Sequence, residues 1–331
     1  MTDLPERLLI TEEGPRESFQ IEPGPIPTAD KIRLIEALSR TGVAAIQACS
    51  FVSPRRVPGW ADAKAVVDGL NARPGVDYTA LWFDDRGLRR ALAHRDVLAL
   101  TGTIHTVASE AFCRRNLNRD LVENATAMEA QTRAHLDAGI EVSKVSVMAA
   151  FGCNFAGDVP VSDALAAVET GLGIAARHGC RIAEVALCDT MGWANPSSVR
   201  RVVGEVRERW PERALRLHLH DTRGLGIANA SAALECGVDR FDTAVGGLGG
   251  CPFAGPSRPR AAPSTATALP PGNIATEELV LLAAEMGIET GIDLDALLAA
   301  GALAEQIVGR ALPSAALRGG HLDAYRRRAR A

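Results

Sequence analysis

The most constraining feature of this chain is a repeated alternation of short apolar runs with longer stretches of helical periodicity. Eight apolar runs are predicted as strands, at residues 8–11, 44–47, 78–83, 97–101, 142–147, 182–187, 215–220 and 241–245. Helices are predicted between them, including residues 30–41, 124–138, 163–178 and 196–209. Strands that alternate with helices are typical of α/β proteins, and eight such units predict a (β/α)8 TIM barrel. A different assignment of one or two strands would instead give a doubly wound open sheet.

Two regions after the eighth predicted strand depart from this alternation. Residues 276–331 are predicted to form a C-terminal helical region, packed on a barrel domain of residues 1–275. This region has helices at 277–286 and 294–301 and a basic tail at 325–330, interpreted as a solvated helix end. Residues 256–271 are rich in proline, alanine, serine and threonine and are predicted to be a mobile loop. The loop would either cover bound substrate or be an idle insertion.

Composition excludes several classes of protein. Of 331 residues, 47% are hydrophobic and 23% charged, which is ordinary for a globular chain, and the net charge of −4 argues against nucleic acid as a partner. We therefore expect small-molecule partners. The chain has no apolar run of the roughly 18 residues that a membrane span needs and no signal peptide, which predicts a cytoplasmic protein without membrane contacts. Its seven cysteines lack CxxC spacing, which indicates reduced thiols, and base rates favour a homodimer.

A histidine pair at the end of the seventh predicted strand is the strongest chemical signal. His218 and His220 are two residues apart, so in a strand their side chains lie on one face. Two neutral imidazoles placed in this way can bind a divalent metal ion. The alternative is a polar strand edge with two solvated histidines.

Other unusual polar and glycine-rich segments also follow predicted strands, where catalytic groups of TIM barrels lie. These segments are residues 12–18, 47–54, 188–192 and 246–252. In and around them, residues 12–20, 50–54, 184–192, 218–222, 246–254 and 272–277 resemble the signatures of the hydroxymethylglutaryl-CoA lyase family, a group of metal-dependent lyases and Claisen-type synthases built on TIM barrels. The resemblance covers most of the chain and depends on several long motifs that occur in one order.

The resemblance implies a divalent cation, magnesium or manganese, bound by Glu17, His218, His220 and Asn273. Mixed nitrogen and oxygen ligands of this kind leave positions open for a substrate hydroxyl and carboxylate. The partner that the resemblance implies is a small acyl thioester linked to CoA. The implied substrate-binding residues are Gln47, Ser50, Asn154, Thr190 and Gly249.

The resemblance also implies roles for three catalytic residues. Arg16 would stabilise the enolate oxygen that forms when the carbon–carbon bond breaks, because a guanidinium stays charged and offers several donors. Cys251 would protonate the enolate at carbon, and Asp189 would act in proton transfer near the substrate hydroxyl. The ordinary alternatives are an Arg16 paired structurally with Glu12 or Glu17, an inert cysteine, and an aspartate that caps a turn.

Several departures from the family pattern bear on the substrate. Glu17 replaces an aspartate, and Gln47 replaces a glutamate, which would make the pocket less anionic. Residues 152–157 and the long loop between Cys251 and Asn273 also differ. The expected function is a metal-dependent carbon–carbon lyase that acts on hydroxymethylglutaryl-CoA or a related 3-hydroxy-3-carboxymethyl acyl thioester. The alternatives are a condensing enzyme of the same superfamily and a catalytically impaired homologue that binds ligand.

Overall fold

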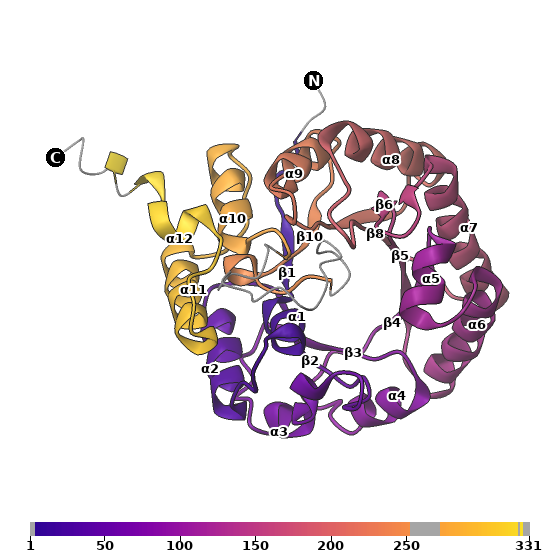
Figure 1. The fold of residues 1–331 in the computed structure, drawn as a ribbon, viewed down its shortest axis with the longest axis horizontal. Coiled ribbons are helices and arrows are strands. Elements are labelled where there is room, and N and C mark those ends of the chain that lie inside the picture. The colour runs from indigo at the N-terminus through magenta and orange to yellow at the C-terminus, as the bar shows by residue number, and fades with distance from the viewer. Residues whose placement is uncertain (1–3, 252–271, 324, 327–331) are drawn as a thin grey trace, which may run out of the picture.

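Eight parallel strands, surrounded by helices, form a barrel in the computed structural model, which describes residues 4–251, 272–323 and 325–326 (Figure 1). The strands are β1 (Leu9–Glu12), β2 (Ala45–Ser50), β3 (Asp77–Leu81), β4 (Gly102–Val107), β5 (Val142–Met148), β8 (Glu184–Cys188), β9 (Ala214–His218) and β10 (Arg240–Thr243). Their order in the sheet is β3-β2-β1-β10-β9-β8-β5-β4. The predicted α/β barrel is therefore confirmed. The predicted loop at 256–271 lies outside the described residues, as does the tail from 327 onward.

Helices lie between the strands along the chain, and the longer ones, such as α6, α7 and α8, cover the outside of the sheet (Figure 1). They are α1 (Gly14–Ile21), α2 (Thr28–Ser39), α3 (Ala63–Asp68), α4 (Asp85–Leu92), α5 (Glu110–Leu117), α6 (Leu121–Asp137), α7 (Val161–Arg177), α8 (Pro196–Arg209), α9 (Gly226–Glu235), α10 (Thr276–Glu285), α11 (Leu294–Val308) and α12 (Ala315–Gly319). A short hairpin, β6 (Gly152–Cys153) and β7 (Gly157–Asp158), precedes α7. Helices α6 and α8 begin at capping boxes, where Asp120 and Asn195 accept backbone N–H groups.

The prediction of the fourth strand is wrong by about one strand length. The apolar run at 97–101 does not enter the ladder with β5; its Leu98 is buried and bridges to Tyr78 of β3, which closes the ring. The strand β4 begins instead at Gly102, where a Cβ atom would lie 2.7 Å from a methyl group of Val142. The close approach to β5 therefore starts where a side chain is missing, rather than where apolar residues are densest.

The two faces of the strands differ in polarity. In β9, Leu215 and Leu217 point outward and are buried beneath the helices, while Arg216 and His218 point into the barrel. Apolar burial of this kind contributes about 1.5–3 kcal/mol per large side chain. The interior below the histidines is ionic, because the Arg216 guanidinium contacts Glu184 at 2.8 Å and Asp242 at 2.9 Å. These carboxylates and Arg216 form what we call the interior ion layer.

The C-terminal helices lie outside the ring. In Figure 1, α11 (yellow) lies beside α2 and packs against both α2 and α10, while α12 packs on α10 and α11. The helix α10 follows β10 along the chain and contacts α9. The predicted domain boundary at residue 275 therefore separates β10 from its own helix, and this boundary stays a prediction. Among the described helices, none has the length and apolarity that crossing a membrane requires. All seven cysteines lie in the described part of the chain, and none forms a disulfide.

Candidate metal and active site

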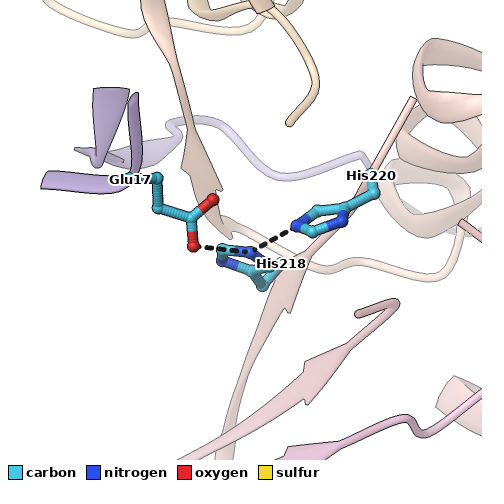
Figure 2. A group of neighbouring side chains, drawn as sticks. All are labelled: Glu17, His218 and His220. Carbon is cyan, nitrogen blue, oxygen red and sulfur yellow. Dashed lines mark hydrogen bonds and ion pairs between the residues drawn. The ribbon is translucent and has the colours of Figure 1, made fainter. Parts of the chain in front are cut away.

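His218 and His220 approach each other at the carboxyl end of the barrel. His218 is the last residue of β9, and the segment that follows is held in place by Asn273, which bridges to His220. The Nε2 atoms of the two buried rings are 3.1 Å apart, and both face the carboxylate of Glu17 (Figure 2). The predicted pair is therefore turned into the protein and is not a solvated strand edge.

Glu17 and Asn273 complete the cluster from two distant segments. Glu17 comes from α1, and its Oε1 atom lies 3.7 Å from Nε2 of His218. Its Oε2 atom accepts hydrogen bonds from Nδ2 of Asn273 at 2.6 Å and from the backbone N–H of Gly250 at 3.1 Å. The side-chain Oδ1 atom of Asn273 is buried and has no hydrogen-bond partner among the described residues. A buried acceptor without a partner is costly, which indicates that something else occupies its lone pairs.

These donors fit a divalent cation. Ligand distances of about 2.0–2.2 Å place neighbouring donors about 3 Å apart, close to the observed separation of the two Nε2 atoms. Although burial alone would raise the pKa of Glu17, Arg16 and the two histidines lower it, so the carboxylate is ionised. Burial and the neighbouring His218 lower the pKa of His220 to about 4, which leaves its imidazole neutral. Without a cation, a proton on one Nε2 atom would form the hydrogen bond to the other Nε2 atom. A bound cation would take the place of this proton.

Arg16 lies directly beside this cluster. It is on α1, which is anchored by the indole N–H of Trp60 donating to the Arg16 carbonyl at 2.8 Å. Its Nη1 atom contacts Glu17 at 2.8 Å, while Nε donates to Gln47 and Nη2 pairs with Glu13. The guanidinium is buried, so its charge acts in a poorly screened environment.

Three residues of the site were missed by sequence reasoning. Glu13 pairs with Arg16, so it supplies a carboxylate that the replacement at Gln47 was expected to remove. Asp242 is the neighbour of His218 in the β9–β10 ladder, and its Oδ2 atom lies 3.4 Å from Nδ1 of that ring. His105 points inward from β4, where burial and the charges of His135 and Arg16 lower its pKa to about 4. His105 was missed because the fourth strand was predicted at residues 97–101, before it. Asp242 could have been found, because it is a charged residue inside an apolar predicted strand.

Asp189, Thr190 and Ser50 lie at the ends of strands, and the side chain of each accepts backbone N–H groups. Burial raises the pKa of Asp189 to about 7, and its two oxygens accept backbone N–H groups from Trp193 at 2.6 Å and Ala194 at 3.0 Å. It therefore caps this turn, while its role in proton transfer stays a prediction. The Thr190 hydroxyl accepts from the N–H of Ala149 at 2.9 Å, and the buried Ser50 hydroxyl accepts from Val52 at 3.3 Å. The two hydroxyls therefore bond to the backbone, while the backbone of Thr190 lies beside the His220 ring.

The glycine-rich segment after β10 forms one wall of the cluster. A Cβ atom on Gly249 would lie 2.5 Å from Cβ of Glu17 and 2.9 Å from Nδ2 of Asn273. The backbone of this segment is fixed at its start, because the buried Glu12 and Glu277 accept the N–H groups of Val245 and Gly246, each at 3.0 Å. Gly249 therefore packs against two of the proposed cation ligands, Glu17 and Asn273, and its role in substrate binding stays a prediction.

The remaining two predicted residues lie around Trp193. The side-chain oxygen of Asn154 accepts from the indole N–H of Trp193 at 2.7 Å, and Cys251 packs against a small apolar cluster that includes Trp193 and Met191. Cys251 is half-buried. Their predicted roles in substrate binding and protonation stay predictions.

Comparison with known proteins gives a consistent result. The HMGL-like family matches residues 7–304. The chain is 36% identical over 310 residues to hydroxymethylglutaryl-CoA lyase YngG of Bacillus subtilis, with 94% of this chain and 96% of the relative covered. It is 34% identical to the mitochondrial hydroxymethylglutaryl-CoA lyase of Homo sapiens, with 94% and 88% covered. A solved hydroxymethylglutaryl-CoA lyase of Acinetobacter baumannii, in complex with coenzyme A and 3-methylmalate, superposes with a TM-score of 0.82 at 35% identity and covers 97% of both chains.

Proposed function

Because this chain belongs to the HMGL-like family, we propose that it is a divalent-metal-dependent carbon–carbon lyase. Its substrate would be hydroxymethylglutaryl-CoA or a related 3-hydroxy-3-carboxymethyl acyl thioester, as for the similar lyases. The observation that carries this proposal is the convergence of Glu17, His218, His220 and Asn273, with Arg16 alongside, at the carboxyl end of the barrel. We further propose that the protein works in the cytoplasm as a homodimer.

We propose magnesium or manganese as the cation. Two imidazole nitrogens, a carboxylate and an amide oxygen form a mixed donor set that suits these ions and leaves further positions open. A bound cation would act as a Lewis acid that polarises the hydroxyl and carboxylate oxygens of the substrate.

The side chains of this protein would then divide the reaction among them. Asp189 would accept the proton of the tertiary hydroxyl; its raised pKa suits transfer near neutral pH, and each oxygen keeps a second lone pair beside its backbone hydrogen bond. Arg16 would stabilise the negative charge that collects on the thioester oxygen as the carbon–carbon bond breaks. Cys251 would then donate a proton to the enolate carbon, which yields acetyl thioester and a 3-oxo acid.

The test is a steady-state assay of acetyl-CoA release from hydroxymethylglutaryl-CoA with Mg²⁺ or Mn²⁺. We expect turnover by the wild type and a loss of at least about a hundredfold in kcat for His218→Ala, Arg16→Ala and Cys251→Ala. Cys236→Ala is the matched control, because Cys236 is a second half-buried cysteine that lies just after α9.

The alternatives predict different results in the same assay. A condensing enzyme would form the thioester from its products faster than it cleaves it, and an impaired homologue would bind cation and thioester without turnover. Either result would overturn the lyase proposal, as would near-normal rates in all three site variants.

A further inference from the structure

The His218 ring contacts carboxylates on both of its nitrogen atoms. Its Nε2 atom faces Glu17 and His220, as described above. Its Nδ1 atom lies 3.4 Å from Oδ2 of Asp242 and 3.6 Å from Oε2 of Glu13. All of these groups are buried, so each ring nitrogen has a fixed protein partner rather than water.

We propose that Asp242, supported by Glu13, is a positioning residue that keeps the proton of His218 on Nδ1 and thereby directs Nε2 toward the cation. This inference rests on the metal site of the proposed function. An imidazole that binds a metal through one nitrogen keeps its proton on the other, and a carboxylate that receives this N–H fixes both the tautomer and the ring orientation. Asp242 is suited to this because it lies next to His218 in the sheet and faces the same side.

Asp242 is itself held in place by the interior ion layer. Its Oδ1 atom accepts from Nη1 of Arg216 at 2.9 Å, which leaves Oδ2 for the His218 ring. The same guanidinium binds Glu184 through Nε and Nη2. The orientation of a cation ligand at the top of the barrel is thus tied to the Asp242–Arg216 ion pair one layer below.

Glu13 connects His218 to Arg16. The Oε2 atom that faces Nδ1 of His218 is the same atom that pairs with Nη2 of Arg16. Because this oxygen is shared and slightly more distant, Glu13 contributes less than Asp242 to the orientation of the ring. It places one carboxylate between the cation ligand and the residue proposed to stabilise the enolate.

The geometry argues against a second cation at Nδ1. Glu13, His218 and Asp242 lie close enough together to hold one, and His218 would then bridge two ions. However, each carboxylate already pairs with an arginine, Glu13 with Arg16 and Asp242 with Arg216. A dication placed there would lie close to two buried guanidinium groups that cannot lose their charge. We therefore expect one cation per chain.

The test is the affinity and stoichiometry of Mn²⁺ binding, measured by electron paramagnetic resonance on the full chain. We expect one bound Mn²⁺ in the wild type and a dissociation constant raised about 10- to 100-fold in Asp242→Asn. Glu13→Gln should show a smaller increase. The matched control is Glu184→Gln, which also removes a carboxylate from Arg216 but leaves Nδ1 of His218 in contact with Asp242. Its affinity should stay within twofold of the wild type.

The outcomes separate this inference from the proposed function. If the wild type binds no Mn²⁺, the metal site itself is wrong. If the wild type binds one ion but Asp242→Asn binds as tightly as Glu184→Gln, only the positioning role is overturned. Two ions per chain would also overturn it. Should Asp242→Asn fail to fold, as judged by circular dichroism, Glu13→Gln decides: unchanged affinity there refutes the inference.

Discussion

Replacing Gly249 by alanine should damage the metal site through one added methyl group. The backbone of Gly249 has a φ of +82°, and the new Cβ atom would lie 2.5 Å from Cβ of Glu17 and 2.9 Å from Nδ2 of Asn273. An alanine with this φ costs about 1–2 kcal/mol. Forcing a methyl group against closely packed neighbours costs about 1–3 kcal/mol more. The free energy of unfolding should therefore fall by about 2–5 kcal/mol.

A second glycine separates the two costs. Gly75 has a φ of +84°, but a Cβ atom there would have no neighbour within 4 Å. Gly75→Ala should therefore lose only the backbone cost of about 1–2 kcal/mol. Its affinity for Mn²⁺ should stay unchanged, because the residue lies in the loop before β3 and contacts no cation ligand. Gly249→Ala should bind Mn²⁺ at least about tenfold more weakly, since Glu17 and Asn273 must both move.

The assay is urea unfolding in the presence of a chelator, followed by Mn²⁺ titration of the folded variants. Chelation removes any contribution of the cation to stability, so unfolding reports the strain alone. If Gly249→Ala and Gly75→Ala lost equal stability and bound Mn²⁺ equally well, the close packing of Gly249 on the ligands would be refuted.

Three further predictions concern the substrate, the cation and pH. Glu17→Asp combined with Gln47→Glu should raise kcat/KM for hydroxymethylglutaryl-CoA, because it restores the family residues; an unchanged value in steady-state kinetics would mean that these positions do not set substrate choice. A chelator should abolish activity, and excess Mn²⁺ should restore it and stabilise the protein by about 2.7 kcal/mol at 100 times its dissociation constant, as thermal unfolding would show. Burial opposes ionisation of Glu184, but Arg216 and its other cationic neighbours lower its pKa from 4.5 to about 2. The stabilisation of a few kcal/mol is therefore present above pH 4.5 and lost as the pH falls toward 2, and Glu184→Gln should remove this part of the acid dependence in urea titrations.

The barrel was predictable because its strands repeat a simple apolar pattern. The bounds of an individual strand were not always predictable from that pattern. The run at 97–101 is more apolar than the true strand Gly102–Val107, because it packs on the core and bridges to Tyr78 without a long ladder. Apolar density alone cannot distinguish these two situations. As a result, His105 was not predicted to face the barrel interior, because it lies in the strand whose position was wrong.

The site was predictable in part from spacing and in part from resemblance. The i, i+2 spacing of His218 and His220 places both on one face whatever the exact register of β9. Glu17 and Asn273 are 256 positions apart, and nothing local in the sequence indicates that they share a hydrogen bond. Glu13 was missed because it lies just after β1, at the start of α1, where the sequence does not show that Glu12 meets Val245 while Glu13 meets Arg16.

The interior ion layer has a consequence for the traffic of small molecules. With Glu184, Arg216 and Asp242 filling the barrel beneath His218, a ligand cannot pass through to the amino-terminal side of the strands. Both fragments of a cleaved substrate must leave by the route through which it arrived. A product that stays bound there blocks the next substrate molecule. We therefore expect the products to inhibit the enzyme competitively with substrate.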